Sequence, residues 1–360
     1  MDNYVALIMA GGGGTRLWPM SRKDKPKQLL PLIEEHSMFR TTVERLHPLF
    51  TPQQIYVVTG PQYVEDMKAE APEIPVENFI VEPYGRNSGP AVALAMRIIH
   101  ERQPNAVVAM LSVDHHIARK DEFRAVLASA YEVAMQDYTV ILGISPSFPS
   151  TGFGYVRQGE KLGHFGGHEA YIARGFTEKP NLVKATEFLL SGEYTWNSGM
   201  FIWKSSLAVG EFKRQQPAMT ALLDRLRPTL NTPQYQDTLD DIWEHFPKIS
   251  IDYAIMEGVE KMAVIPVDFG WSDVGTWSSL FDVLDLDEAG NAFKGQSPDQ
   301  IVLDTKNTLV FSDRLVATIG VEDIIVVDTP DAILICHKSR SQDVREIVNA
   351  LQSRKKHDYL

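Results

Sequence analysis

The chain has 360 residues, of which 44% are apolar and 23% charged, and this composition excludes a wholly disordered protein. Its 47 acidic and 35 basic residues give a net charge of −12, which argues against general binding to nucleic acid or to an anionic membrane. The single cysteine, Cys336, excludes an intramolecular disulfide and a cysteine-based metal knuckle. No apolar run approaches the ~18 residues of a membrane span, and the first residues lack the pattern of a signal peptide. We therefore expect a cytoplasmic protein of about two domains.

The first half of the chain alternates short apolar runs with helical patterns. The apolar runs predict buried strands, because a parallel sheet covered on both faces buries the side chains of its strands. These strands are expected at Tyr4–Ala10, Gln54–Thr59, Asn78–Val81, Ala106–Leu111 and Thr139–Ile144. Helices are predicted at Pro90–Arg102 and Glu122–Gln136. Strands that alternate with helices predict an open α/β sheet, whose ligands bind beyond the carboxyl ends of the strands.

The second half of the chain changes in character twice. Further strands are predicted at Ala170–Phe176 and Gly199–Lys204, and residues 206–262 are predicted to be mainly helical. From about residue 296, short apolar runs without helices between them predict a compact all-β unit or a few coils of a β-helix. These runs are Gln300–Leu303, Thr308–Phe311, Leu315–Ile319, Asp323–Val327 and Ala332–Ile335, followed by a helical pattern at Ser341–Ser353. A boundary at Asp285–Ser297 would divide the chain into domains at 1–285 and 296–360.

A glycine-rich segment, Gly11–Gly14, directly follows the first predicted strand. Four glycines let the backbone approach a ligand closely and turn its N–H groups toward an anion. The segment fits neither the dinucleotide fingerprint, whose third glycine position is Arg16 here, nor a Walker loop, which needs Gly-Lys-Ser/Thr. Arg16 and Lys27, the latter fixed by the preceding proline, are therefore candidates for direct contact with phosphates. A strand-to-helix turn without a ligand is the alternative.

Two aspartates stand where a ligand would bind. Asp114 follows a predicted buried strand, and Asp273 lies in a loop rich in glycine and tryptophan. Two carboxylates that meet near phosphates suit Mg²⁺, which takes few protein oxygens and keeps phosphate and water ligands. The alternative for each aspartate is a cap of a helix or turn.

Seven motifs in order over residues 1–280 resemble those of sugar-1-phosphate nucleotidylyltransferases. The segment GGGGTRLWPMSRKDKPKQ at residues 11–28 is similar to the signature of the GDP-mannose pyrophosphorylase (mannose-1-phosphate guanylyltransferase) branch. The later motifs contain Glu82-Pro83 with Arg86–Pro90, Asp114-His115, Phe176–Pro180, Trp196–Phe201, Ser250–Tyr253 and Phe269–Gly275. The all-β tail resembles the short left-handed β-helix of this family. The resemblance implies a Rossmann-like, mixed and mostly parallel sheet with helices on both faces, a small β-helix-like C-terminal domain, and a homodimer.

The family's reaction assigns roles to the matching residues. It transfers GMP from GTP to α-D-mannose 1-phosphate, giving GDP-mannose and pyrophosphate, with Mg²⁺ or Mn²⁺ as cofactor. The metal would bind Asp114 and Asp273, and the catalytic cations would be Arg16, Lys27 and Lys179. The nucleotide would contact Ala10, Gly11, Gly12, Gly13, Gly14, Thr15, Glu82, Arg86, Asn87 and Ser88. The sugar would contact Glu178, Asn197 and Asp252.

Several of these assignments have a plain structural alternative. Glu82 is expected to accept hydrogen bonds from the N1–H and N2–H₂ groups of guanine, but it could equally pair with Arg86 at (i, i+4) spacing. Lys179 is expected to hold the sugar phosphate, and a surface ion pair with Glu178 is the alternative. Asp252 either binds the sugar or caps a helix.

Three other functions remain open from the sequence. The chain could be a nucleotidylyltransferase for another base or sugar, or a non-catalytic regulatory protein that binds GDP-mannose. The completeness of the set of Arg, Lys and Asp residues argues against the second. An NAD-dependent dehydrogenase is disfavoured by the missing third glycine. Isomerase activity, which some relatives carry in a further cupin-like domain, is not expected.

Overall fold

The computed structural model describes residues 1–295 and 300–360, and the chain forms two compact units. The first unit comprises Met1–Gly11, Val43–Val113 and Ile117–Trp271. The second unit comprises Gly12–Thr42, Asp114–His116 and Ser272–Leu360. Each unit is therefore assembled from segments that lie far apart in the sequence.

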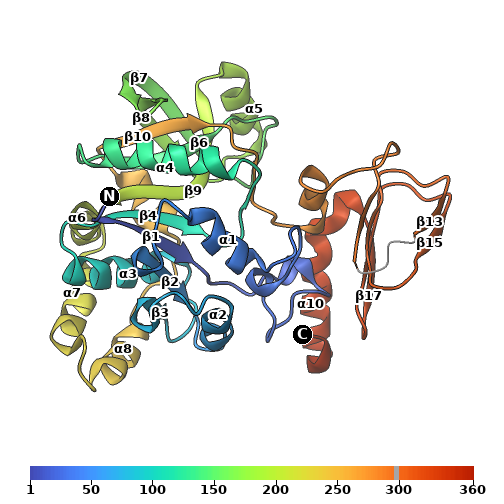
Figure 1. Ribbon diagram of the computed structural model, residues 1–360, viewed down its shortest axis with the longest axis horizontal. Helices are drawn as coiled ribbons and strands as arrows, with labels where there is room; N and C mark the ends of the chain where they lie inside the picture. Colours follow the sequence, from blue (N-terminus) through green and yellow to red (C-terminus); the bar gives the residue numbers. More distant parts are fainter. Residues whose placement is uncertain (296–299) are drawn as a thin grey trace. The chain divides into compact units, whose positions relative to one another are not determined.

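A nine-stranded mixed sheet forms the centre of the first unit (Figure 1). Its strand order is β3-β2-β1-β4-β9-β6-β10-β8-β7. The strands β1 to β4 pair in parallel, while β9 lies antiparallel between β4 and β6. The strands are β1 (Tyr4–Met9), β2 (Ile55–Thr59), β3 (Phe79–Val81), β4 (Val107–Ser112), β6 (Thr139–Ile144), β7 (Tyr155–Phe165), β8 (His168–Thr177), β9 (Tyr194–Lys204) and β10 (Met262–Val267).

Helices surround this sheet, and the longest two have fifteen residues each (Figure 1). In α3 the residues Gly89–Ile99 are buried throughout, which explains why the apolar pattern continues around the helix. The helices of this unit are α2 (Val64–Glu70), α3 (Ser88–Arg102), α4 (Lys120–Ala134), α5 (Leu182–Ser191), α6 (Ser205–Gln215), α7 (Pro217–Leu226), α8 (Tyr235–Trp243) and α9 (Ile251–Ala254). Three further elements extend across the division of the chain: α1 (Met38–Leu46) and the paired short strands β5 (His116–Ile117) and β11 (Trp271–Ser272).

The last part of the second unit is built from short strands in coils. Strands β12, β14 and β16 pair in parallel in one sheet, and the intervening strands β13 and β15 pair in parallel in another. Strand β17 then pairs antiparallel with β16. This alternation of two sheets along the chain is that of a short β-helix. The elements are β12 (Ala292–Lys294), β13 (Ile301–Leu303), β14 (Leu309–Phe311), β15 (Ala317–Ile319), β16 (Ile324–Asp328), β17 (Ile333–His337) and α10 (Val344–Ser353).

Gly12–Gly14 belong to the second unit, and the residues that follow them join its apolar core. Trp18 and Leu17 share a buried cluster with Trp277, the strands of the β-helix and α10. The indole N–H of Trp277 donates to the Trp18 carbonyl at 3.0 Å, and the indole N–H of Trp18 donates to the Tyr359 carbonyl at 2.7 Å. These two hydrogen bonds connect the segment after β1 with the segment after Asp273 and with the end of the chain.

The predicted fold class is confirmed, and most predicted elements lie within two residues of the observed ones. Of the hairpin of β7 and β8, the sequence predicts only β8. Strand β7 carries mostly polar and partly exposed residues and lacks a regular apolar alternation. The proposed boundary at Asp285–Ser297 runs through loops and β12, and its last two residues lie outside the described part of the chain. Within the described residues, no helix has the length and apolar character needed to cross a membrane.

Trp277→Phe should destabilise the second unit because it leaves the buried Trp18 carbonyl without its donor. Trp203→Phe is the matched control, since the indole N–H of Trp203 is buried without an acceptor among the described residues. We expect Trp277→Phe to lower the free energy of unfolding in urea by about 1–3 kcal/mol more than Trp203→Phe does. Equal losses in the two variants would show that this hydrogen bond contributes nothing.

Candidate active site

The glycine-rich segment presents an exposed backbone. Gly12 has φ of 95° and Gly14 has φ of 58°, and residues Gly11–Gly13 are exposed. A Cβ atom added to Gly12 or Gly13 would meet no described atom within 4 Å, so there is room for a ligand against this backbone. Thr15 and Arg16 follow in the short 3₁₀ helix η1 (Thr15–Leu17), and both are exposed. The guanidinium of Arg16 lies 3.5 Å from the side-chain oxygen of Gln342.

Lys27 lies against this segment and is buried. It begins the 3₁₀ helix η2 (Lys27–Leu29) directly after Pro26, whose fixed φ suits the start of such a turn. A Cβ atom on Gly14 would overlap with the Cβ of Lys27, so the glycine is required for this packing. The amide of Gln28 donates to the Gly12 carbonyl at 3.3 Å, a contact that sequence reasoning missed because a glutamine beside a lysine carries no recognisable signal.

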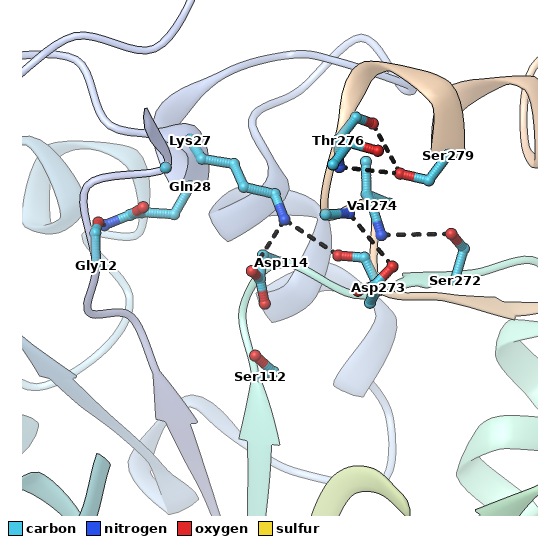
Figure 2. Close-up of polar contacts among 12 residues, drawn as sticks. Gly12, Lys27, Gln28, Ser112, Asp114, Ser272, Asp273, Val274, Thr276 and Ser279 are labelled. Carbon is cyan, nitrogen blue, oxygen red and sulfur yellow. Dashed lines mark hydrogen bonds and ion pairs between the residues drawn. The ribbon is translucent and has the colours of Figure 1, made fainter. Parts of the chain in front are cut away.

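The ammonium of Lys27 connects the segments of the two aspartates. Figure 2 shows its Nζ atom pointing between Asp114 and Asp273. Nζ donates to Asp114 Oδ2 at 2.9 Å and to the backbone carbonyl of Asp273 at 3.1 Å. Lys27, Asp114 and Asp273 thus converge within one unit, although 246 residues separate Lys27 from Asp273.

The electrostatics of this cluster fit a divalent cation. Burial raises the pKa of Asp273, and the charge of Asp114 raises it further, while Lys27 and Arg16 lower it. Two neighbouring carboxylates that repel each other in this way are suitable hard-oxygen ligands for Mg²⁺ or Mn²⁺. Among the described residues, no group of three or more His, Cys, Asp or Glu side chains is placed to hold a metal. Asp114 and Asp273 would therefore leave most coordination positions to phosphate and water.

Glu82 is a buried carboxylate at the end of β3, in the first unit. Its side chain is 7% exposed, and its Oε2 atom has no hydrogen-bond partner among the described residues. Burial raises its pKa from 4.5 to about 7. A Cβ atom on Gly11 would lie 3.5 Å from Glu82 Oε1, which places the first glycine of the segment next to this carboxylate. Ala10 precedes it, with its N–H bonded to the Val58 carbonyl at 2.8 Å.

The alternative of an ion pair between Glu82 and Arg86 is not observed among the described residues. The guanidinium of Arg86 donates instead to the Tyr84 hydroxyl and to the Glu244 carbonyl, both at 2.9 Å. Asn87 is the N-cap residue of α3, with φ of 71°, and its side chain accepts from the Ser88 N–H. The Ser88 hydroxyl accepts from the Ile251 N–H at 2.9 Å and so connects α3 with α9.

Glu178 and Lys179 follow β8 and form an ion pair with each other. The Glu178 side chain is nevertheless 5% exposed, and its Oε2 atom has no partner among the described residues. Burial raises the pKa of Glu178, and the charge of Asp252 contributes in the same direction. A Cβ atom on Gly154 would come within 2.5 Å of Glu178 Oε2, so Gly154 makes room for this carboxylate. The expected ion pair is thus present, with the side chain of Lys179 exposed and that of Glu178 buried.

Asn197 and Asp252 meet in the same unit. The Asn197 amide donates to Asp252 Oδ1 at 3.0 Å, and its oxygen accepts from the Gly199 N–H at 2.9 Å. Burial raises the pKa of Asp252. Ser250, not Asp252, is the N-cap residue of α9, so capping does not account for the aspartate. Lys27, Asp114 and Asp273 thus lie together with Gly12–Gly14 in the second unit, here called the phosphate-loop cluster, while Glu178, Asn197 and Asp252 lie together in the first unit.

Comparison with known proteins gives family matches over two parts of the chain. Residues 5–290 match the nucleotidyl transferase family, and residues 299–351 match the MannoseP isomerase/GMP-like beta-helix domain. Mannose-1-phosphate guanylyltransferase 2 of Escherichia coli O157:H7 is 37% identical, over 99% of this chain and 75% of that protein. The chain belongs to the mannose-1-phosphate guanylyltransferase family. The family predicted from the sequence motifs is thereby confirmed, and with it the assignment to the nucleotidyltransferases.

A further relative and a solved structure are similarly close. Xanthan biosynthesis protein XanB of Xanthomonas campestris pv. campestris is 38% identical, over 98% of this chain and 74% of that protein. The crystal structure of the protein named mannose-1-phosphate geranyltransferase from Thermus thermophilus has a TM-score of 0.86 and 33% identity. The match covers 97% of this chain and 99% of that one. The chain spans about three quarters of the length of the Escherichia coli and Xanthomonas relatives.

The raised pKa of Glu82 predicts how stability depends on pH. Because the folded pKa lies above the unfolded one, the favourable contribution of the protonated carboxyl is present below pH 4.5 and is lost as the pH rises through about 7. Glu82→Gln lacks this dependence. The stability of wild type relative to Glu82→Gln should therefore fall by about 3 kcal/mol between pH 4.5 and 8, measured by urea unfolding.

The exposed residue Glu77 supplies the control for this experiment. Glu77→Gln removes one negative charge from the surface, and its effect on stability at each pH is the baseline with which Glu82→Gln is compared. Parallel pH curves for wild type and Glu82→Gln would contradict the raised pKa of Glu82.

Proposed function

We propose that this protein transfers GMP from GTP to α-D-mannose 1-phosphate, giving GDP-mannose and pyrophosphate. The observation that carries the proposal is the contact of Lys27 Nζ with Asp114 and with the Asp273 carbonyl, next to an exposed glycine backbone. This arrangement suits a triphosphate with a divalent cation. The choice of guanine and mannose is supported by the relatives from Escherichia coli, which are named mannose-1-phosphate guanylyltransferases.

The chemical step needs positioning and charge neutralisation more than proton transfer. A phosphate oxygen of mannose 1-phosphate attacks the α-phosphorus of GTP in line and forms a new P–O bond. The bond from the α-phosphorus to the bridging oxygen breaks, and pyrophosphate leaves with that electron pair. The attacking oxygen is already anionic, so no general base is required.

The phosphate-loop cluster would bind the leaving group. The backbone N–H groups of Gly11–Gly14 and Thr15, together with Arg16 and Lys27, would hold the β- and γ-phosphates. Asp114 and Asp273 would hold Mg²⁺ or Mn²⁺, which when bound neutralises charge on the α-phosphate. Lys27 is buried and begins a short 3₁₀ helix, so its ammonium is held in position before the reaction. A charge that is already in position stabilises the negative charge of the transition state without the reorganisation that water would need.

The first unit would recognise the nucleoside and the sugar. Glu82 would accept hydrogen bonds from guanine N1–H and N2–H₂, a pair of donors that adenine lacks, and its unpartnered Oε2 has the capacity to do so. Ala10, Arg86, Asn87 and Ser88 would line the nucleoside pocket. Lys179 would hold the sugar phosphate, and the hydroxyls of mannose would bond to Glu178, Asn197 and Asp252.

Asp114→Ala and Asp273→Ala test the core of this proposal. Each variant should lose at least about 10²-fold in the rate of GDP-mannose formation from GTP and mannose 1-phosphate, because a charge that stabilises the transition state is removed. Thermal melting should be nearly unchanged in Asp273→Ala, which keeps the carbonyl that Lys27 contacts, and lower in Asp114→Ala, which leaves the buried ammonium without its carboxylate. Asp24→Ala, which removes an exposed aspartate of the same unit, is the control and should keep wild-type activity. Near-normal activity in both site variants would overturn the metal assignment.

A further inference from the structure

The ammonium of Lys27 lies beside the two aspartates that are the candidate metal ligands. Its Nζ lies 2.9 Å from Asp114 Oδ2 and 3.1 Å from the Asp273 carbonyl, so it touches both segments that supply the candidate metal ligands (Figure 2). The ammonium therefore serves as the counter-ion of the Asp114 carboxylate and is held in place by the backbone of the Asp273 segment.

The position of this ammonium is tied to the glycine-rich segment. The Lys27 stem packs against Gly14, where no Cβ atom would fit, and the neighbouring Gln28 bonds to the Gly12 carbonyl. A polyphosphate bound along this segment would come within reach of the same Nζ atom. Lys27 thus has two alternative anionic partners: Asp114 and the phosphates.

A lysine ammonium and a divalent cation cannot both lie against the same carboxylate oxygen without strong repulsion. At separations of about 4 Å, like charges in a protein interior repel by several kcal/mol. The Lys27 ammonium must therefore leave Asp114 before a divalent cation binds there, or as it binds. Phosphates that attract the ammonium would lower this barrier, and binding linkage makes the effect reciprocal.

We propose that Lys27 is a resident counter-ion that keeps Asp114 from binding a divalent cation until a polyphosphate draws the ammonium away. The cation alone binds weakly, and the nucleotide and the cation favour each other's binding. This inference rests on the proposed function, because it takes Asp114 and Asp273 as the metal ligands. It gives Lys27 a second role: the ammonium favours the binding of phosphate and opposes the binding of a divalent cation.

The test measures Mn²⁺ binding to the full-length protein without nucleotide, by electron paramagnetic resonance of the free ion. Lys27→Met keeps the aliphatic stem and removes the charge. It should bind Mn²⁺ about tenfold more tightly than wild type, or about 1.4 kcal/mol. Lys25→Met is the matched control, since it removes the same charge from an exposed position two residues away and should bind Mn²⁺ like wild type.

Four outcomes separate the inference from the proposed function. Tighter Mn²⁺ binding by Lys27→Met, lost again in the double variant with Asp114→Asn, would support the inference. Binding by Lys27→Met that equals or falls below wild type, while Asp114→Asn weakens it, would overturn the inference and leave the metal site standing. An equal gain in Lys25→Met would also overturn it, because the effect would be one of net charge. Binding that is indifferent to both Asp114→Asn and Asp273→Asn would overturn the metal assignment itself.

Folding of the variant is checked by circular dichroism and thermal melting. If Lys27→Met does not fold, Lys27→Gln takes its place, because its neutral amide still donates to Asp114. The same tenfold gain is expected, and its absence in a folded Lys27→Gln protein would equally overturn the inference.

Discussion

One buried ammonium group determines the arrangement of the phosphate-loop cluster. Lys27 Nζ bonds to a residue that follows β4 and to a carbonyl 246 residues further along the chain than Lys27 itself. A buried lysine without such partners would be strongly destabilising. The hydrogen bonds of Lys27 therefore also fix the positions of the loops that carry Asp114 and Asp273. The hydrogen bonds of Trp277 and Trp18 hold the neighbouring segments in the same unit. The β-helix strands and α10 share an apolar cluster with Trp18, so the C-terminal strands take part in supporting the glycine-rich segment.

The first unit contains the complementary feature, an excess of buried carboxylates. Burial raises the pKa values of Glu82, Glu178 and Asp252, and both glutamates keep an oxygen without a partner among the described residues. Such acceptors cost free energy in the absence of a ligand. They are suited to the hydroxyls of a sugar and the N–H groups of a base, which supply the missing donors. Perturbed carboxyl groups of this kind gather at functional sites more often than elsewhere.

Much of this could be predicted from the sequence, and the failures have physical causes. Buried parallel strands and α3 were predictable because burial on both faces leaves continuous apolar runs, as at Tyr4–Met9. The polar strand β7 was not, since half-exposed hairpins lack that signal. Motif order identified the family and pointed to Asp114 and Asp273 as candidate metal ligands. Their joint contact with Lys27 depends on three segments that are distant in sequence, and the grouping of Gly12–Thr42 with the C-terminal segments depends on tertiary contacts that no local pattern contains.

The central claim is nucleotidyl transfer that selects guanine and needs a divalent cation. Its most direct test is the release of pyrophosphate by the wild-type protein with mannose 1-phosphate and Mg²⁺, compared across GTP, ATP, UTP and dTTP, each with and without EDTA. We predict rapid release with GTP, little with the other three nucleotides, and none when EDTA is present. Equal release with ATP would contradict the assignment of Glu82 to guanine. Release that is unaffected by EDTA, or no release from a folded protein that still binds GDP-mannose, would contradict the account as a whole.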